Sequence, residues 1–375
     1  MAEVLGPLTL LNKALPTGVD GTRLAEWAMR DGITYGQLAQ SVSLALGAVN
    51  QEVTQKWGFL FGLTEELYME YPNGGAVTPM DELTDVDKPV PIHGTTIGHM
   101  LPLKYYGQGI GGSKRYFRDV RSAQIAASIK VIALRGIWRF EQTLLGRFFD
   151  SDEVAIGSVG YSVPFVHSTG GAVDFAPPSY DGADFTTSHD HFIGYNVSTP
   201  LTMADVLNGL AQTLAEHGHN APYTALVSRA DIALFSALTK FVELVDNVVS
   251  VIDRGGGTTG SQFFTNGNRD LGRIGYFQSE VGLVELIASN RIPTAYVGMT
   301  KSYGQLDSRN ALAVRVHPSR GFGLAIVPET TPDDDFPIKQ LDVDFEFGVG
   351  VGMDRTNGCV GYLIAGGSYS DAAID

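Results

Sequence analysis

The segment 118–149 constrains the fold of this chain more than any other part of the sequence. It reads RDVRSAQIAASIKVIALRGIWRFEQTLLGRFF, contains no proline and has glycine only at 136 and 146. Helix-forming residues without a proline predict a continuous helix. At about 1.5 Å per residue, the segment would span roughly 48 Å, whereas an average globular helix has only about 11–12 residues. We therefore expect one long, rigid helix.

This expected helix has two chemically different sides. One arc of the helical wheel is apolar and is expected to be buried: Val120, Val131, Leu134, Ile137, Trp138, Leu144, Leu145, Phe148 and Phe149. The opposite arc is basic: Arg118, Arg121, Arg135, Arg139 and Arg147. Three isoleucines, Ile125, Ile129 and Ile132, share the arginine arc, so the middle of the helix is expected to be covered on both sides.

Charge is distributed unevenly along the chain. Residues 104–147 hold nine basic and two acidic residues, whereas the whole chain has 26 basic and 41 acidic residues and a net charge of −15. An acidic protein does not bind nucleic acid through its overall charge. A basic stripe on such a protein indicates an acidic partner, either another subunit or a polyanion, and a merely solvated face remains the alternative.

The remaining elements follow in a mixed order. Shorter helices are expected at 34–49 with Thr34 as N-cap, at 202–217 with Thr202 as N-cap, at 230–245 and at 281–288. Strands are expected at 223–229, 294–299, 311–318, 322–329, 338–353 and 359–366. Residues 1–20 read as an extended arm, and residues 76–117, with four prolines and a glycine cluster, as a long extended excursion. The fold class is therefore α+β.

Glycine and cysteine motifs give no active site. G-x-G-x-x-G occurs at 107–112 and 255–260, but neither copy lies in an alternating βαβ series, so loop glycines are favoured over dinucleotide binding. The single cysteine, Cys359, excludes an intrachain disulfide and any cysteine-based zinc site. Its apolar strand context favours a buried thiol over a nucleophile. These motifs therefore supply no candidate catalytic residue and no cofactor.

Histidine and aspartate clusters are the candidate metal ligands. His189 and His191 could point to one face of a strand, and His217 and His219 bracket a glycine at a helix end. A polar loop and a capped helix terminus are the favoured interpretations, so no metal site is assigned. The acidic run 333–335 lacks calcium-loop spacing and is expected to be a solvated turn. No signal peptide or transmembrane segment is expected.

The order of these elements resembles the major capsid proteins of tailed bacteriophages, which have the Hong Kong 97-type fold. The resemblance covers nearly the whole chain, and two phrases carry it locally: FEFGVGVGMDRTNGCVGYLI is similar to the closing strands of the family, and ADIALFSALTK to a helix of its axial domain. It implies an N-terminal arm with short helices at 1–75, an extended loop at 76–117, a peripheral domain at 118–200 and 305–348 with spine helix 118–149, and an axial domain at 201–304 and 349–375.

The same resemblance implies a structural function. Hexamers and pentamers of the chain would close an icosahedral shell around double-stranded DNA, which it would contact without sequence specificity. Portal, scaffold and decoration proteins are the other expected partners, with no membrane. The location is the virion, after assembly in the host cytoplasm. Because the expected arm begins near Met1, the scaffold is expected to be a separate protein.

The resemblance also implies roles for basic residues. Arg118, Arg121, Arg135, Arg139 and Arg147 would face the genome, a scaffold or a neighbouring subunit. Lys88, Lys104, Lys114 and Arg115 are candidate contacts of the extended loop. Some relatives cross-link a loop lysine to an asparagine, for which Asn310 and Asn357 would be acceptors here, but no catalytic glutamate matches. The alternatives are an encapsulin-type compartment shell and a soluble α/β enzyme.

Overall fold

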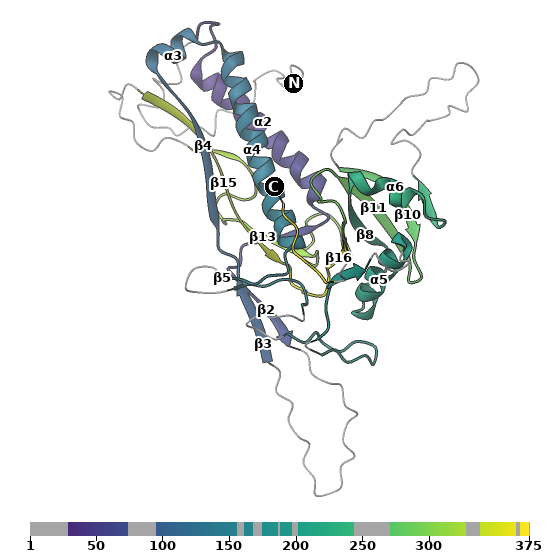
Figure 1. Cartoon of the computed structure of the whole chain (residues 1–375). Coiled ribbons are helices and arrows are strands. Elements are labelled where there is room, and N and C mark those ends of the chain that lie inside the picture. The colour runs from purple at the N-terminus through teal and green to yellow at the C-terminus, as the bar shows by residue number, and fades with distance from the viewer. Residues whose placement is uncertain are drawn as a thin grey trace, which may run out of the picture. The chain divides into compact units, whose positions relative to one another are not determined.

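A computed structural model describes residues 29–73, 95–155, 161–167, 175–186, 188–196, 202–243, 271–327, 338–364 and 368–374. Figure 1 shows the described helices and strands as ribbons. The chain divides into two compact units. Unit 1 comprises residues 1–55, 102–140 and 315–348, and unit 2 comprises 56–101, 141–314 and 349–375. The predicted boundaries of the arm, the peripheral domain and the axial domain differ from the boundaries of these two units. They stay a prediction. Of the described helices, none combines the length and hydropathy needed to cross a membrane.

The described part of the chain mixes helices with strands, as the α+β prediction requires. The helices are α2 (Tyr35–Trp57), α3 (Lys114–Asp119), α4 (Ser122–Phe149), α5 (Met203–Glu216), η1 (Arg229–Asp231) and α6 (Ile232–Ser236). The strands from β1 to β8 are β1 (Phe61–Thr64), β2 (Tyr68–Asn73), β3 (Thr95–Met100), β4 (Lys104–Ser113), β5 (Val154–Ala155), β6 (Tyr161–Ser162), β7 (Phe192–Asn196) and β8 (Tyr223–Ser228). Those from β9 onward are β9 (Phe241–Glu243), β10 (Leu271–Gln278), β11 (Leu283–Ser289), β12 (Tyr296–Thr300), β13 (Leu312–Arg315), β14 (Ala325–Val327), β15 (Ile338–Val351) and β16 (Cys359–Ile364).

Helix α2 begins where the sequence predicts. The Thr34 amide donates to Gln37 Oε1 at 3.0 Å, and the Gln37 amide donates to Thr34 Oγ1 at 3.3 Å. This reciprocal pair is a capping box, which satisfies two backbone donors that the first turn leaves free. Helix α5 uses the same device between Thr202 and Asp205.

The long helix begins later than predicted. Its first residue is Ser122, because Val120 is extended at φ −81° and ψ 152° and separates α4 from the short α3. The Ser122 amide and hydroxyl donate to Asp31 Oδ2 at 2.9 and 2.5 Å. A carboxylate at this end accepts from free backbone donors and suits the positive end of the helix dipole.

In unit 1, β15 is the central strand of an antiparallel ribbon. It pairs with β4 from Ile338↔Ser113 to Phe347↔Lys104, and with β14 from Ala325↔Asp344 to Val327↔Asp342. Phe140 of α4 packs against this ribbon, with ring centroids 5.7 Å from Phe345 and 5.2 Å from Phe347. The first glycine motif, Gly107–Gly112, lies on β4 and is therefore strand rather than a phosphate-binding loop.

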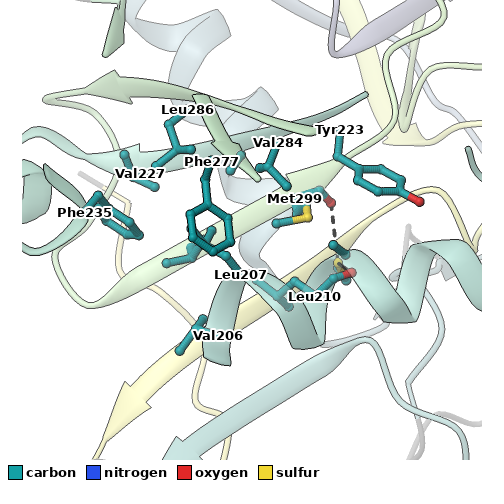
Figure 2. Close-up of a cluster of buried hydrophobic side chains, with 14 of the residues drawn as sticks. Val206, Leu207, Leu210, Tyr223, Val227, Phe235, Phe277, Val284, Leu286 and Met299 are labelled. Atoms are coloured by element: carbon teal, nitrogen blue, oxygen red, sulfur yellow. Dashed lines mark hydrogen bonds between the residues drawn. The ribbon is translucent and has the colours of Figure 1, made fainter. Parts of the chain in front are cut away.

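Unit 2 contains a seven-stranded sheet in the order β7-β16-β12-β8-β11-β10-β9. Helix α5 buries Val206, Leu207, Leu210 and other apolar residues against side chains of this sheet (Figure 2). Each such side chain stabilises the packing by about 1.5–3 kcal/mol when it leaves water. Cys359 is fully buried in this core, as predicted, and burial raises its pKa well above the usual value.

Three predicted helices are corrected by the structure. Residues predicted as helix at 281–288 form β11, which pairs with β8 on one side and β10 on the other. A short apolar run fits a buried strand as well as a helix, and here the two neighbouring strands decide. The helix predicted at 230–245 is reduced to η1 and α6, followed by β9. The helix predicted at 118–149 is shortened to 122–149 by the break at Val120.

A hairpin of unit 2 contains part of the predicted extended loop 76–117, because its second strand is β3. Strands β2 and β3 pair antiparallel from Tyr68↔Met100 to Asn73↔Thr95. The chain between them, 74–94, lies outside the described residues. The base of the hairpin is anchored by Tyr71, which is buried and whose hydroxyl donates to Gly352 O at 2.9 Å.

Candidate functional site

The exposed surface of α4 is the strongest candidate for a functional surface in unit 1. Val131, Leu134 and Trp138 are 48, 54 and 40 % exposed. They lie at spacings of three and four residues, which places them on one face of the helix. The basic side chains Lys130, Arg135 and Arg139 are also exposed on this helix. We call these six residues the α4 surface.

The middle of α4 was predicted to be covered on both sides, and only one of the two sides is buried. The buried side chains there are Ile125, Ile129 and Ile132, which the helical wheel placed among the arginines. Leu324 packs directly over Gly136 on this side, within 2.6 Å of where a Cβ would lie. The apolar arc with Val131, Leu134 and Trp138 is exposed instead. Only in the last turns, at Leu144, Leu145, Phe148 and Phe149, is the predicted apolar arc buried.

Two of the five predicted arginines precede the long helix. Arg118 lies on α3, where its Nε donates to Asp119 Oδ1 at 2.9 Å, and both side chains are more than 60 % exposed. Arg121 is exposed in the break between α3 and α4. Because the chain is extended at Val120, neither residue shares the helical phase of Arg135 and Arg139.

Arg139 and Arg135 remain as exposed basic residues of α4. The Arg139 guanidinium lies 5.0 Å from the centre of the Tyr106 ring on β4, a cation–π contact. From residue 120 to residue 140 the sequence contains no acidic residue. The α4 surface therefore combines three cations with an apolar ridge, a combination that fits an acidic partner with apolar side chains of its own.

Arg147 does not belong to an exposed stripe. It is 6 % exposed, and its Nη2 donates to the carbonyls of Asp150 and Asp152 at 2.6 and 3.0 Å. Burial lowers the pKa of its guanidinium, while the nearby carboxylate of Asp150 opposes that shift. The residue holds the end of α4 to the following turn, so its predicted role as a surface contact is corrected to a structural one.

The predicted loop contacts are only partly described. Lys104 is exposed at the start of β4, and Arg115 is exposed on α3. Lys114 is the first residue of α3, and Lys88 lies outside the described residues. Lys104 therefore lies at the start of β4 and Arg115 just beyond its end, and their contacts with another chain stay a prediction.

The two asparagines considered as cross-link acceptors are buried structural residues. Asn357 Nδ2 donates to the carbonyls of Lys301 and Arg309, and its Oδ1 accepts from the Lys301 amide at 2.9 Å. Asn310 Nδ2 donates to three carbonyls, of Gly58, Phe61 and Gly304. Both side chains are 0 % exposed. Each amide is already committed to holding loops together, so neither is accessible to a lysine of another subunit.

The structure brings together histidines that the sequence presents as two separate pairs. His189 and His191 precede β7, and His217 ends α5, yet their ring nitrogens lie close together. His219, by contrast, turns away and contacts Tyr303 and Thr356. The convergence depends on β7 and α5 meeting at the same edge of the seven-stranded sheet, which local sequence does not reveal.

No protein-family model matches the sequence, and no curated protein matches it. A solved structure described as "Mycobacterium phage Patience" has a chain similar to this one, with a TM-score of 0.60 and 18 % identity over 92 % of each chain. A chain of "Capsid of native GTA particle computed with C5 symmetry" has a TM-score of 0.44 and 11 % identity, over 84 % of this chain and 91 % of that one. A chain of "Asymmetric unit of bacteriophage PhiM1 mature capsid" has a TM-score of 0.42 and 12 % identity, over 80 and 85 %.

Of these three chains, the first is similar enough to assign a fold. Its likeness extends over nearly the full length of both chains, so the order of elements is shared and not only one local motif. The predicted Hong Kong 97-type fold is thereby confirmed.

Proposed function

We propose that this chain is the major capsid protein of a tailed bacteriophage. It assembles as hexamers and pentamers into an icosahedral shell that encloses double-stranded DNA. The observation that carries the proposal is the likeness over 92 % of both chains to a chain of Mycobacterium phage Patience. The chain acts as a structural subunit in the virion rather than as an enzyme.

The α4 surface supports self-association independently of that likeness. A monomeric protein normally buries its large apolar side chains, and exposed ones that cluster mark interaction sites. Val131, Leu134 and Trp138 form such a cluster on the longest helix. A second copy of the chain, or a scaffold protein, covers them during assembly.

The acidic chain as a whole suits this arrangement. Its net charge of −15 opposes uncontrolled contact between free subunits. The basic residues of α3 and α4 provide local attraction, either to acidic surfaces of neighbours or to packaged DNA. In the DNA case the contact is with phosphates, which explains how a shell can hold any genome sequence.

Sedimentation velocity tests the proposal directly. The purified protein, expressed alone and with the genes next to its own, should form particles of several megadaltons. Nucleic acid absorbance in particles from infected cells should exceed that of protein alone. A sharp boundary corresponding to a small oligomer under both conditions would contradict the proposal, and megadalton particles that hold other proteins instead of DNA would favour the encapsulin-type alternative.

A further inference from the structure

Three histidines of unit 2 form a compact cluster of ring nitrogens. His189 and His191 lie just before β7, and His217 is the C-cap residue of α5. His217 Nε2 lies 2.9 Å from His189 Nε2 and 3.0 Å from His191 Nε2. One ring nitrogen of each residue lies within 4.8 Å of the other two. These are spacings at which three imidazoles reach one ion.

The hydrogen bond of His191 directs a lone pair into this cluster. Its Nδ1 lies 2.7 Å from the carbonyl oxygen of Gly358. A carbonyl only accepts, so Nδ1 carries the proton and Nε2 of the neutral ring presents its lone pair to His217. Metal-binding histidines are held in the same way, with the second ring nitrogen donating to a carbonyl or carboxylate.

The protons available do not satisfy all three rings. The one N–H of the neutral His191 ring already donates to the carbonyl of Gly358. A neutral ring has one N–H, and one proton on His217 Nε2 points well at only one of its two neighbours. The nitrogen of the other neighbour then lies close to His217 Nε2 without a hydrogen bond between the two. A cation among the three nitrogens removes this conflict.

The distances fit a small tetrahedral ion. Zinc binds histidine nitrogen at about 2.0–2.1 Å, which separates two nitrogens of a tetrahedral site by roughly 3.3–3.4 Å. The observed 2.9 and 3.0 Å are within about 0.5 Å of that edge. Imidazole donors select zinc and its transition-metal neighbours, whereas calcium and magnesium prefer oxygen ligands.

The ligands are fixed from both sides. The His191 amide donates to Val166 O at 2.9 Å, and the His191 carbonyl accepts from the Val360 amide at 2.8 Å. Phe185 covers His217 and His189, with ring centroids 4.2 and 4.8 Å away. The nearest carboxylate in sequence, Asp190, is directed elsewhere, to His167 Nδ1 and the Phe192 amide.

We propose that His189, His191 and His217 bind one zinc ion per chain, with water in the fourth position. The ion ties the end of α5 to the start of β7 and stabilises that edge of the seven-stranded sheet. The site is independent of shell assembly, because all three ligands belong to one chain and to unit 2.

The test is metal titration of the purified full-length protein after treatment with a chelator. Zn²⁺ should bind at one ion per chain in calorimetry and raise the melting temperature. Co²⁺ should give the intense visible absorption of a four- or five-coordinate site. In His189→Gln/His217→Gln, both residues being only partly buried, affinity should fall at least about 100-fold, since two of three ligands are lost. His317→Gln, a histidine of unit 1 that contacts Ser319, is the matched control and should bind as the unchanged protein does.

Two results would overturn the proposal. One is the absence of stoichiometric binding by the unchanged protein. The other is equal zinc affinity and equal cobalt absorption in the double variant. Circular dichroism establishes that the double variant is folded, and the single variant His189→Gln, which removes one half-exposed ligand, provides the same comparison if the double variant is not.

Discussion

Two glycines show how different the demands on this residue are. Gly298 lies on β12, and a Cβ there would meet Phe148 Cε1 at 2.5 Å and Phe149 Cζ at 3.2 Å, in rings that are fully buried. Gly146 lies on α4, where a Cβ would meet nothing within 4 Å. Glycine is required at 298 because the two phenylalanine rings approach the backbone closely. At 146 no side chain comes near, and glycine only makes the helix less stable.

Opposite effects of the same substitution should follow. Gly298→Ala forces rigid rings to shift and should lower the free energy of unfolding by about 1–3 kcal/mol. Gly146→Ala should raise it by about 0.5–1 kcal/mol, because alanine favours the helix. Urea unfolding followed by tryptophan fluorescence measures both. Equal effects of the two substitutions would show that the packing of Phe148 against β12 is described wrongly.

His99 makes the stability of unit 2 sensitive to acid. Its Nδ1 lies 2.9 Å from the Tyr71 hydroxyl, and its buried Nε2 has no hydrogen-bond partner among the described residues. Burial, with a smaller contribution from the positive charges of Arg355 and Arg147, lowers its pKa to about 3. The folded chain therefore resists a proton that the unfolded chain accepts below about pH 6.5.

The sign of the effect follows from this difference. Between about pH 6.5 and pH 3 the unfolded state binds more protons at this site, so stability falls as pH falls. The contribution is about 1.4 kcal/mol per pH unit. From pH 6.5 to 4.5, the unchanged protein should lose about 2–3 kcal/mol more than His99→Gln, which cannot be protonated. Urea unfolding at each pH measures this loss. Parallel losses in both proteins would exclude His99 as the cause.

At the scale of elements, the helices show which features of the sequence were sufficient to predict where a helix forms. The absence of proline predicted a long helix, and Thr34 and Thr202 predicted two other helix starts. The break at Val120 was not predictable, because it depends on Asp31 capping Ser122 from 91 residues away. Periodicity also did not determine which apolar side of α4 is buried. The helix has two apolar ridges, one with Ile125, Ile129 and Ile132 and the other with Val131, Leu134 and Trp138. On the side of the first ridge, Leu324 packs over Gly136, and Phe345 and Phe347 of β15 pack against Phe140.

The second ridge should therefore matter for assembly and not for folding. Leu134→Ser/Trp138→Ser removes side chains that are 54 and 40 % exposed, so the unfolding free energy should fall by only about 1 kcal/mol. The yield of large particles in sedimentation should fall at least about tenfold. The contrasting variant Leu144→Ala, on the buried end of the same helix, should instead destabilise the chain by about 2–5 kcal/mol. Normal particle yield from the double variant would show that the α4 surface takes no part in assembly.

The basic residues provide a separate prediction. Arg135→Glu/Arg139→Glu reverses two exposed charges of the α4 surface, while Arg135→Lys/Arg139→Lys keeps them. If the α4 surface meets acidic neighbours, reversal should reduce particle yield. If it meets DNA, reversal should leave empty shells with lowered nucleic acid content. The lysine variant should resemble the unchanged protein in both measurements, and unaffected assembly and filling after reversal would refute both roles.

At the scale of the whole molecule, the order of elements was more informative than any motif. The glycine motifs, the lone cysteine and the acidic run gave no function, and the first glycine motif is part of β4. The succession of excursion, long helix, mixed section and closing strands led to the fold that the Patience chain shares. The histidine cluster could not be predicted in this way. It depends on the parallel pairing of β7 with β16, whose residues lie 168 positions further along the chain than their partners in β7, and the local sequence does not indicate this pairing.

Electron microscopy of particles from the purified protein is the measurement that tests the central claim most directly. The account predicts uniform icosahedral shells, with hexamers and pentamers of this chain and with α4 in contact with a neighbour, a scaffold or DNA. Images that show only small oligomers, whether the protein is expressed alone or with the genes beside its own, would contradict it.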